Sequence, residues 1–154
     1  MRAQGADRLA RTPFDKLGRD DLKRITHYWL SQESHFAENT RNLVASLTSW
    51  FGLLRGESAR RFEFADMFSD IVQSDPTASE MMQCRALFFV MMNGKTNQFN
   101  HLEYAAMLRA KEVDACCVGS VALYLFLRFH CTNESFPDLD ANTDWFNIKV
   151  WAYS

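Results

Sequence analysis

Two basic residues, Lys95 and Arg55, carry side chains suited to binding a phosphate group. Lys95 lies in the string NGKTNQ (residues 93–98), which follows a long apolar run and precedes a mixed polar and apolar segment. An Asn-Gly pair between two such runs is typical of a β-hairpin with a type I′ turn, because both residues tolerate positive φ. The string therefore predicts a hairpin over residues 84–108 whose tip presents Lys95.

Arg55 follows an apolar stretch in the string LLRGE. A guanidinium donates two parallel hydrogen bonds to phosphate oxygens, and a lysine adds a mobile point charge. In the alternative interpretation Arg55 pairs with Glu57 or Glu63, and Lys95 only keeps a hairpin tip soluble. Both interpretations stay open. If a phosphate-binding surface forms, we expect it to include further basic and polar residues, namely Arg60, Arg61, Asn97, Gln98, Arg109 and Lys111.

The composition limits the classes of protein and of partner. The 154 residues are 47% hydrophobic, with 13 Phe and 4 Trp, so one domain with a real core is expected. A net charge of −2 argues against a strongly basic nucleic-acid binder but leaves room for a local basic patch. No apolar run approaches the roughly 20 residues that span a bilayer, and no secretory signal is recognisable. We therefore expect no membrane partner and a reduced cytosolic or nuclear compartment.

Periodicity places three helices along the chain. After a polar lead-in over residues 1–18, a folded domain is predicted over residues 19–154. Its first helix starts near Asp20. Two apolar stripes at helical spacing predict the stronger helices: Leu43, Val44, Leu47, Trp50, Phe51 and Leu54 in one, and Val118, Val121, Ala122, Leu125, Phe126 and Phe129 in the other.

The elements between and after these helices are shorter. Residues 57–68 predict a short helix that passes into an extended piece at 62–64, where Phe62 and Phe64 are interpreted as core anchors. Residues 145–151 predict an apolar terminal helix or strand. The predicted fold class is therefore α+β, dominated by helices, with a small antiparallel β-hairpin or sheet.

Cysteines, histidines and acids do not form a recognisable metal site in the sequence. Cys116 and Cys117 are adjacent, while Cys84 and Cys131 stand alone, so zinc spacing is missing and buried free thiols are expected. The acids Asp138, Asp140 and Asp144 predict a solvated loop rather than a site for a hard cation. We expect neither a metal nor a cofactor.

Several strings taken together resemble one family. They are GLLRGESARRFEFADMF (52–68), GKTNQ (94–98) and EYAAMLRAKEVDACCVGSVALYLFLRFH (103–130), followed by FPDLD and WFNIKV. In order and spacing they are similar to the fungal domain shared by Crypton-type tyrosine recombinases and the DNA-binding scaffold subunit of the point-centromere complex. The resemblance covers roughly residues 10–150. It implies the first half of a tyrosine-recombinase catalytic domain, in which Arg55 and Lys95 match the residues that contact the scissile phosphate.

The chain also departs from the recombinase pattern. No His-x-x-Arg box follows Lys149, and Arg128 and His130 stand in the wrong order. Asn100-His101 stands where the family usually has Gly-Arg, and RAKE (109–112) where it often has Arg-His-Lys-Asp. With no such box before it, Tyr153 is a poor nucleophile. Catalysis by this chain alone is therefore not expected.

Three functions follow as hypotheses. The first is a nuclear, catalytically inactive domain, derived from a tyrosine recombinase, that clamps the phosphate backbone of double-stranded DNA through the residues named above. The second is a fragment of an active DNA strand-transferring recombinase. The third is a protein-interaction module that has lost DNA binding and packs on a partner, or on a second copy, through the exposed parts of the apolar segment 145–151.

Overall fold

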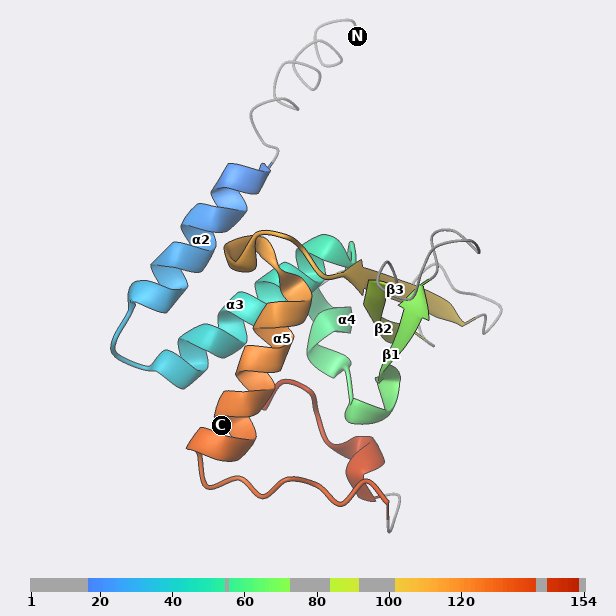
Figure 1. The fold of residues 1–154 in the computed structure, drawn as a ribbon. Coiled ribbons are helices and arrows are strands. Elements are labelled where there is room, and N and C mark those ends of the chain that lie inside the picture. Colours follow the sequence, from blue (N-terminus) through green and yellow to red (C-terminus); the bar gives the residue numbers. More distant parts are fainter. Residues whose placement is uncertain (1–16, 55, 73–83, 92–101, 141–143, 153–154) are drawn as a thin grey trace, which may run out of the picture.

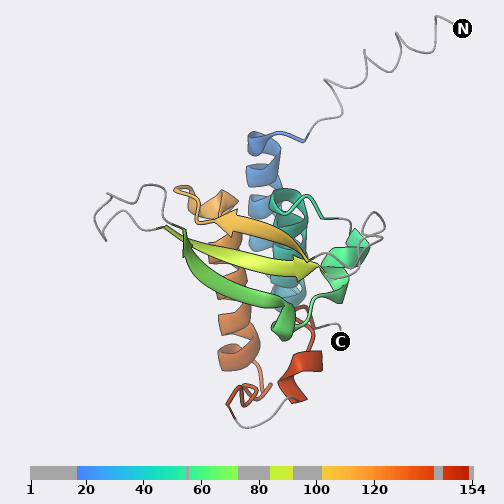
Figure 2. The same ribbon diagram turned by 90° about the vertical axis from the view of Figure 1, so that its right-hand side faces the viewer.

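Helices and a small sheet form two layers in the computed structural model, which describes residues 17–54, 56–72, 84–91, 102–140 and 144–152 (Figure 1). The elements, in chain order, are α2 (Arg19–Ser31), α3 (Phe36–Phe51), α4 (Gly56–Arg61), β1 (Met67–Val72), β2 (Cys84–Met91), β3 (Glu103–Leu108) and α5 (Cys117–Phe126). Helices α2, α3 and α5 lie behind one face of the sheet in Figure 2. The predicted helix-dominated α+β class is confirmed.

The first helix begins where the sequence predicts. The backbone N–H of Gly18, just before α2, donates to Asp21 Oδ2 at 2.9 Å, and Asp20 and Asp21 in the first turn interact favourably with the helix dipole. Its inward side buries Leu22 and Thr26 against α3. No helix among the described residues is both long enough and apolar enough to cross a membrane.

The apolar stripe of α3 is only partly buried. Leu43, Val44 and Leu47 are at most 1% exposed, as predicted. Trp50 and Phe51 are exposed, which contradicts the prediction. The helix ends at Phe51, and the chain turns at Leu53, whose φ is positive. Thr48 in the same last turn is fully buried, so only one side of this turn faces the core.

The sheet contains one more strand than the predicted hairpin. All three strands are antiparallel, in the order β1-β2-β3. Strand β1 was not predicted, because all but one of its side chains are exposed and its sequence carries no burial pattern. The register also corrects the predicted turn. A two-residue turn at Asn93-Gly94 would pair Met91 with Thr96, whereas Met91 pairs with Glu103.

Helix α5 presents a more polar face to the core than predicted. Of the predicted stripe Val121 is buried, whereas Ala122 and Phe126 are exposed. The helix also buries Cys117, Ser120 and Tyr124. The polar residues fit inside because they are hydrogen-bonded: Ser120 Oγ donates to the Cys116 carbonyl at 2.9 Å, and the Tyr124 hydroxyl accepts the N–H of Ala152 at 3.0 Å. The helix then widens into a π-helical turn over Leu127–Cys131.

The C-terminal segment ends in the core. Val150 and Trp151 are fully buried. The backbone of this segment pairs with residues that follow α4, since Phe64 N–H donates to the Ile148 carbonyl and Val150 N–H to the Phe62 carbonyl, both at 2.9 Å. The last two apolar residues of the segment predicted to face a partner are therefore part of the core, whereas Trp145 and Ile148 are half-buried and Phe146 is exposed.

Candidate nucleic-acid interface

The predicted phosphate-binding residues divide into those that the structure describes and those that it does not. Arg55, Lys95, Asn97 and Gln98 lie outside the described residues. Four others are described, and all four are exposed at two separate places: Arg60 and Arg61 in α4, and Arg109 and Lys111 after β3.

Helix α4 exposes two arginines on a fixed backbone. Arg61 Nη2 is 2.5 Å from Glu57 Oε1, one helical turn earlier, so part of its charge is already matched. Arg60 makes no ion pair with another described residue. A short helix of this kind is not stable by itself and needs contacts from elsewhere in the chain.

Those contacts come from the C-terminal segment and the sheet. Trp151 Nε1 donates to the Ala59 carbonyl at 2.7 Å, and Lys149 Nζ donates to the Arg61 carbonyl at 3.0 Å. The buried ring of Phe62 lies 4.6 Å from the ring of Phe89 in β2. Phe62 is thus a core anchor, as predicted, and the direction of α4 is set by residues far away in the sequence.

A second basic site lies where the chain passes from β3 to α5. Arg109 and Lys111 line an open depression of about 440 Å³. The other lining residues are Ala110, Val113, Cys116 and Gly119. Cys116 is the N-cap of α5, and its Sγ accepts the N–H groups of Ala110 and Gly119, each at 3.3 Å. Two cations beside the positive end of a helix dipole favour an anion.

Acidic residues beside this depression are engaged by α2. Lys23 Nζ is 2.7 Å and Arg19 Nε is 3.3 Å from Glu112 Oε2, and His27 Nε2 is 3.4 Å from Asp114 Oδ2. The hydrogen bond from Lys23 lowers the pKa of the Glu112 carboxyl, and the same bond raises the pKa of Lys23. Because Glu112 stays ionised but paired, it cancels little of the charge of Arg109 and Lys111.

The two basic sites lie at opposite ends of the sheet. Helix α4 leads to the start of β1, which pairs with the end of β2, whereas Arg109 follows the far end of β3 (Figure 2). A six-residue strand is about 20 Å long. The structure therefore brings Arg60 close to Arg61 and Arg109 close to Lys111, but it does not bring the two pairs together.

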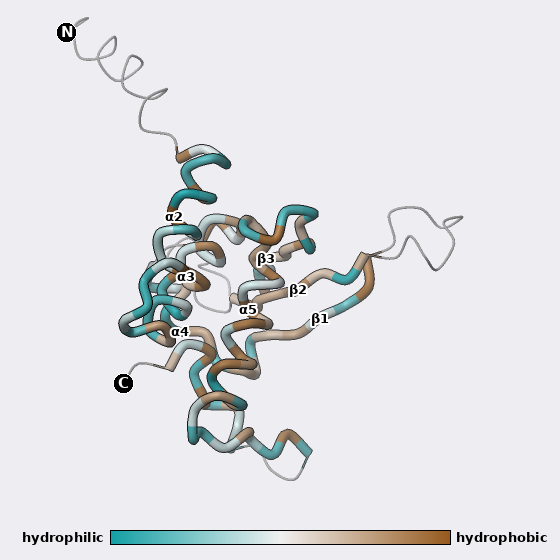
Figure 3. Tube along the Cα trace, turned by 60° about the vertical axis from the view of Figure 1, so that its left-hand side comes forward, coloured by the Kyte–Doolittle hydropathy of each residue, from teal (hydrophilic) through white to brown (hydrophobic). Residues whose placement is uncertain are grey.

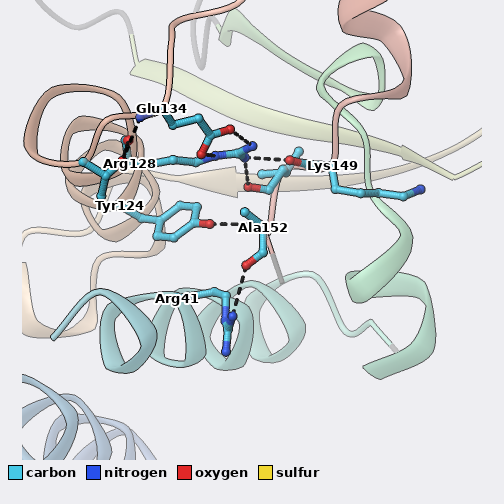
Figure 4. A network of polar contacts seen from close by, with 8 residues as sticks. Arg41, Tyr124, Arg128, Glu134, Lys149 and Ala152 are labelled. Carbon is cyan, nitrogen blue, oxygen red and sulfur yellow. Dashed lines mark hydrogen bonds and ion pairs between the residues drawn. The ribbon is translucent and has the colours of Figure 1, made fainter. Parts of the chain in front are cut away.

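Arg128 has a structural role that the sequence analysis did not identify. Arg128 is buried, and its Nε donates to Glu134 Oε2 at 2.7 Å. Its Nη1 donates to the carbonyls of Lys149 and Val150 at 2.6 and 2.9 Å (Figure 4). Its guanidinium also lies over the Phe129 ring, 4.9 Å from the centroid. An arginine within an apolar helix, six residues before a glutamate, was the available signal.

The four cysteines are free thiols in different surroundings. Cys116 and Cys117 are buried as predicted, whereas Cys84 is half-buried and Cys131 is exposed, so the prediction of burial was wrong for these two. Burial raises the pKa of the Cys117 thiol to about 11. Within the described part of the chain, no group of three potential metal ligands is close enough to hold an ion.

Comparison with known families gives a match over most of the chain. The family model described as "Centromere DNA-binding protein complex CBF3 subunit, domain 2" matches residues 16–152. The match therefore includes both basic sites, the sheet and the C-terminal segment. No curated protein matches the chain.

Proposed function

The chain belongs to the family of domain 2 of the CBF3 centromere DNA-binding complex subunit, and from this membership we propose that it is a DNA-binding domain. It contacts the phosphate backbone of double-stranded DNA rather than base edges. Contacts of this kind position a protein on DNA but do not read its sequence. As a domain of a centromere complex, it acts in the nucleus.

The observation that carries this proposal is the basic depression between β3 and α5. Arg109 and Lys111 are exposed and have no ion pair with another described residue, and the neighbouring Glu112 is held by Lys23. The N-terminal end of α5 adds its positive dipole at the same place. The whole chain has a net charge of −2, so binding depends on this local arrangement and not on overall attraction.

Arg55 and Lys95 complete the proposed backbone contacts. Arg55 directly precedes α4, whose backbone is held in place by Trp151 and Lys149. The two acids considered as alternative partners of Arg55 already bind other cations, since Glu57 pairs with Arg61 and Glu63 with Lys149. This favours a phosphate contact for Arg55 over an intramolecular ion pair.

The two ends of the sheet suit one DNA duplex. Their separation of about 20 Å corresponds to roughly six phosphates along one strand, which are spaced by about 3.4 Å along the helix axis. Asn97 and Gln98 add neutral hydrogen-bond donors to the proposed contacts. A clamp with two anchor points fixes the orientation of the duplex better than one patch does.

We also propose that the domain descends from a tyrosine recombinase and does not catalyse strand transfer by itself. The engagement of Arg128 supports this view, because its guanidinium already binds Glu134 and two carbonyls and cannot contact a phosphate without leaving the core. No step of the proposed function needs a metal or a cofactor.

The test is a titration of duplex DNA at about 50 and about 200 mM salt. Backbone contacts release counterions, so we expect the logarithm of the binding constant to fall linearly with the logarithm of the salt concentration. Arg55→Ala and Lys95→Ala should each reduce that slope by about one, for every DNA sequence tested. Undetectable or salt-independent binding by the unaltered chain would overturn the proposal.

A further inference from the structure

The sheet has an apolar face that none of the described helices covers. Its outward positions are set by the register and alternate with core residues such as Leu87, Phe89 and Met107. They are Phe68, Asp70, Val72, Cys84, Ala86, Phe88, Val90, Tyr104, Ala106 and Leu108, which we call the outer face. The uncovered side of an antiparallel sheet normally carries polar residues. Here the only charged residue among these positions is Asp70.

Aromatic rings organise this face. Phe68 and Phe88 are direct cross-strand partners, and their rings stack at 4.9 Å with only 7° between their planes. Tyr104 reaches over from β3 and meets the edge of Phe68 at 6.2 Å. Nevertheless Phe68 is 42% exposed, Tyr104 53% and Leu108 56%. In Figure 2 this side of the sheet faces the viewer, and Figure 3 shows hydrophobic stretches along the strands.

The charge on the outer face disfavours DNA binding. Asp70 is exposed and forms no ion pair with another described residue; its Oδ1 accepts the N–H of its neighbour Ile71 at 2.7 Å. A carboxylate among aromatic and aliphatic side chains repels phosphate. Exposed aromatic residues with few charges are instead typical of the centre of a protein–protein interface.

The size of the face selects one kind of protein partner. Three strands place the outer two about 10 Å apart, and six residues extend about 20 Å. A backbone footprint of this shape is narrow compared with the broad patch of about 20–30 residues a side that a stable dimer uses. Two copies stacked by this face would also bring two Asp70 carboxylates into one interface. By contrast, an α-helix is about 10 Å wide, and about 13 residues of it extend 20 Å.

We propose that the outer face docks one amphipathic helix of another protein, and that this helix carries a lysine or arginine beside its apolar stripe. The apolar side chains of the helix pack between Phe68, Tyr104 and Leu108, and its basic residue pairs with Asp70. Because the area is small, we expect the affinity to be modest. Such a contact suits one of several interfaces within a larger complex. This docking surface is separate from the C-terminal segment, whose Val150 and Trp151 are buried in the core.

The experiment uses two synthetic helical peptides with the same leucine stripe, one flanked by lysines and the other by glutamates. Each is labelled with a fluorophore and titrated with the whole chain by anisotropy. We expect the lysine-flanked peptide to bind at least tenfold more tightly. Asp70→Lys should reverse this preference, and Tyr104→Ser should weaken the binding of both peptides. Phe126→Ser, which removes an exposed ring from α5, is the matched control and should change neither.

Each alternative outcome overturns the proposal. Equal binding of the two peptides, or an Asp70→Lys variant that keeps the original preference, removes the role of Asp70. Loss of binding in Phe126→Ser places the apolar contact on α5. Self-association of the chain that Tyr104→Ser abolishes identifies a second copy as the occupant. Circular dichroism verifies that each variant is folded. Tyr104→Ser should bind duplex DNA as tightly as the unaltered chain does. This titration separates a failure of the helix-docking proposal from a failure of the DNA-binding proposal.

Discussion

Arg109 and Arg128 lie before and after the same helix, yet the molecule uses them in opposite ways. Arg128 is 7% exposed and has a carboxylate, two carbonyls and an aromatic ring around its guanidinium. Arg109 is exposed beside an open depression and has no ion pair with another described residue. The first arginine is an internal cross-link between α5 and the C-terminal segment, and the second is available to an external anion.

The difference shows that residue type alone does not mark a phosphate contact. A buried guanidinium is stable only when its donors are satisfied, so removing it leaves unpaired groups in the core. An exposed guanidinium is solvated and contributes little to stability until a ligand replaces its water. The two arginines should therefore respond to substitution in different assays, and the following predictions measure that difference.

The largest effect is expected for Arg128→Ala. The change leaves Glu134 and the carbonyls of Lys149 and Val150 without their donor, which should lower the free energy of unfolding by roughly 3 kcal/mol. Urea denaturation followed by circular dichroism measures it. Arg109→Ala is the control and should change the unfolding free energy by less than about 0.5 kcal/mol. Equal stabilities of the two variants would contradict the assignment of Arg128 as a cross-link.

A somewhat smaller effect is expected for Trp151→Phe. The new ring keeps most of the packing against Phe89 and Tyr124 but cannot donate to the buried Ala59 carbonyl. We expect a loss of about 2 kcal/mol in unfolding free energy. Hydrogen exchange should show faster opening of α4, while β2 and β3 stay protected. Uniformly faster exchange in all elements would show that the bond does not hold α4 specifically.

The double variant Arg109→Ala/Lys111→Ala should lose DNA affinity without losing stability. At low salt we expect about a tenfold loss, equal to about 1.4 kcal/mol, and a salt slope smaller by about two. Arg61→Ala provides the comparison, because its guanidinium is shared with Glu57 and its loss should reduce affinity less. If Arg61→Ala is the more damaging change, the principal contact lies at the α4 end of the sheet.

The smallest effect concerns pH. The pKa of Glu112 is lowered from its ordinary value of 4.5 by Lys23, so the pair stabilises the fold above that pH. The stabilisation is lost as the pH falls through the lowered pKa of the folded state. Glu112→Gln should therefore be less stable than the unaltered chain near neutral pH, and the difference should shrink at about pH 3. A difference that stays constant with pH would show that the Glu112 charge is not responsible.

The sequence predicted the elements whose own residues show a regular pattern of apolar side chains. Leu43, Val44 and Leu47 recur at helical spacing on a buried face, so α3 was recognisable. The apolar run before residues 93–98 and the mixed segment after them predicted that β2 and β3 pair. Strand β1 was missed because its stability comes from pairing with β2 and not from its own composition. The buried polar face of α5 was missed because its hydroxyl groups are satisfied in ways that the apolar pattern does not show: Ser120 bonds to the Cys116 carbonyl one turn earlier, and Tyr124 bonds to the distant Ala152.

The sequence named residues for the candidate site, but it could not arrange them on a surface. The four named basic residues that the structure describes are exposed, and their division between two ends of the sheet depends on strand direction and register. The partners of Arg128 and Lys149 also escaped prediction, since each contacts a backbone carbonyl with no sequence signature. Arg55 and Lys95 remain predictions.

The hydrogen bond from Trp151 to Ala59 joins residues 92 positions apart, and it has a consequence for the order of folding. During synthesis α4 emerges from the ribosome long before its anchor exists. The helical pair α2 and α3 can form early, because its contacts are local, whereas closure of so long a loop is slow. A nascent chain released before residue 148 should therefore leave α4 and its arginines mobile. Only the late docking of the last residues gives this end of the sheet its final geometry.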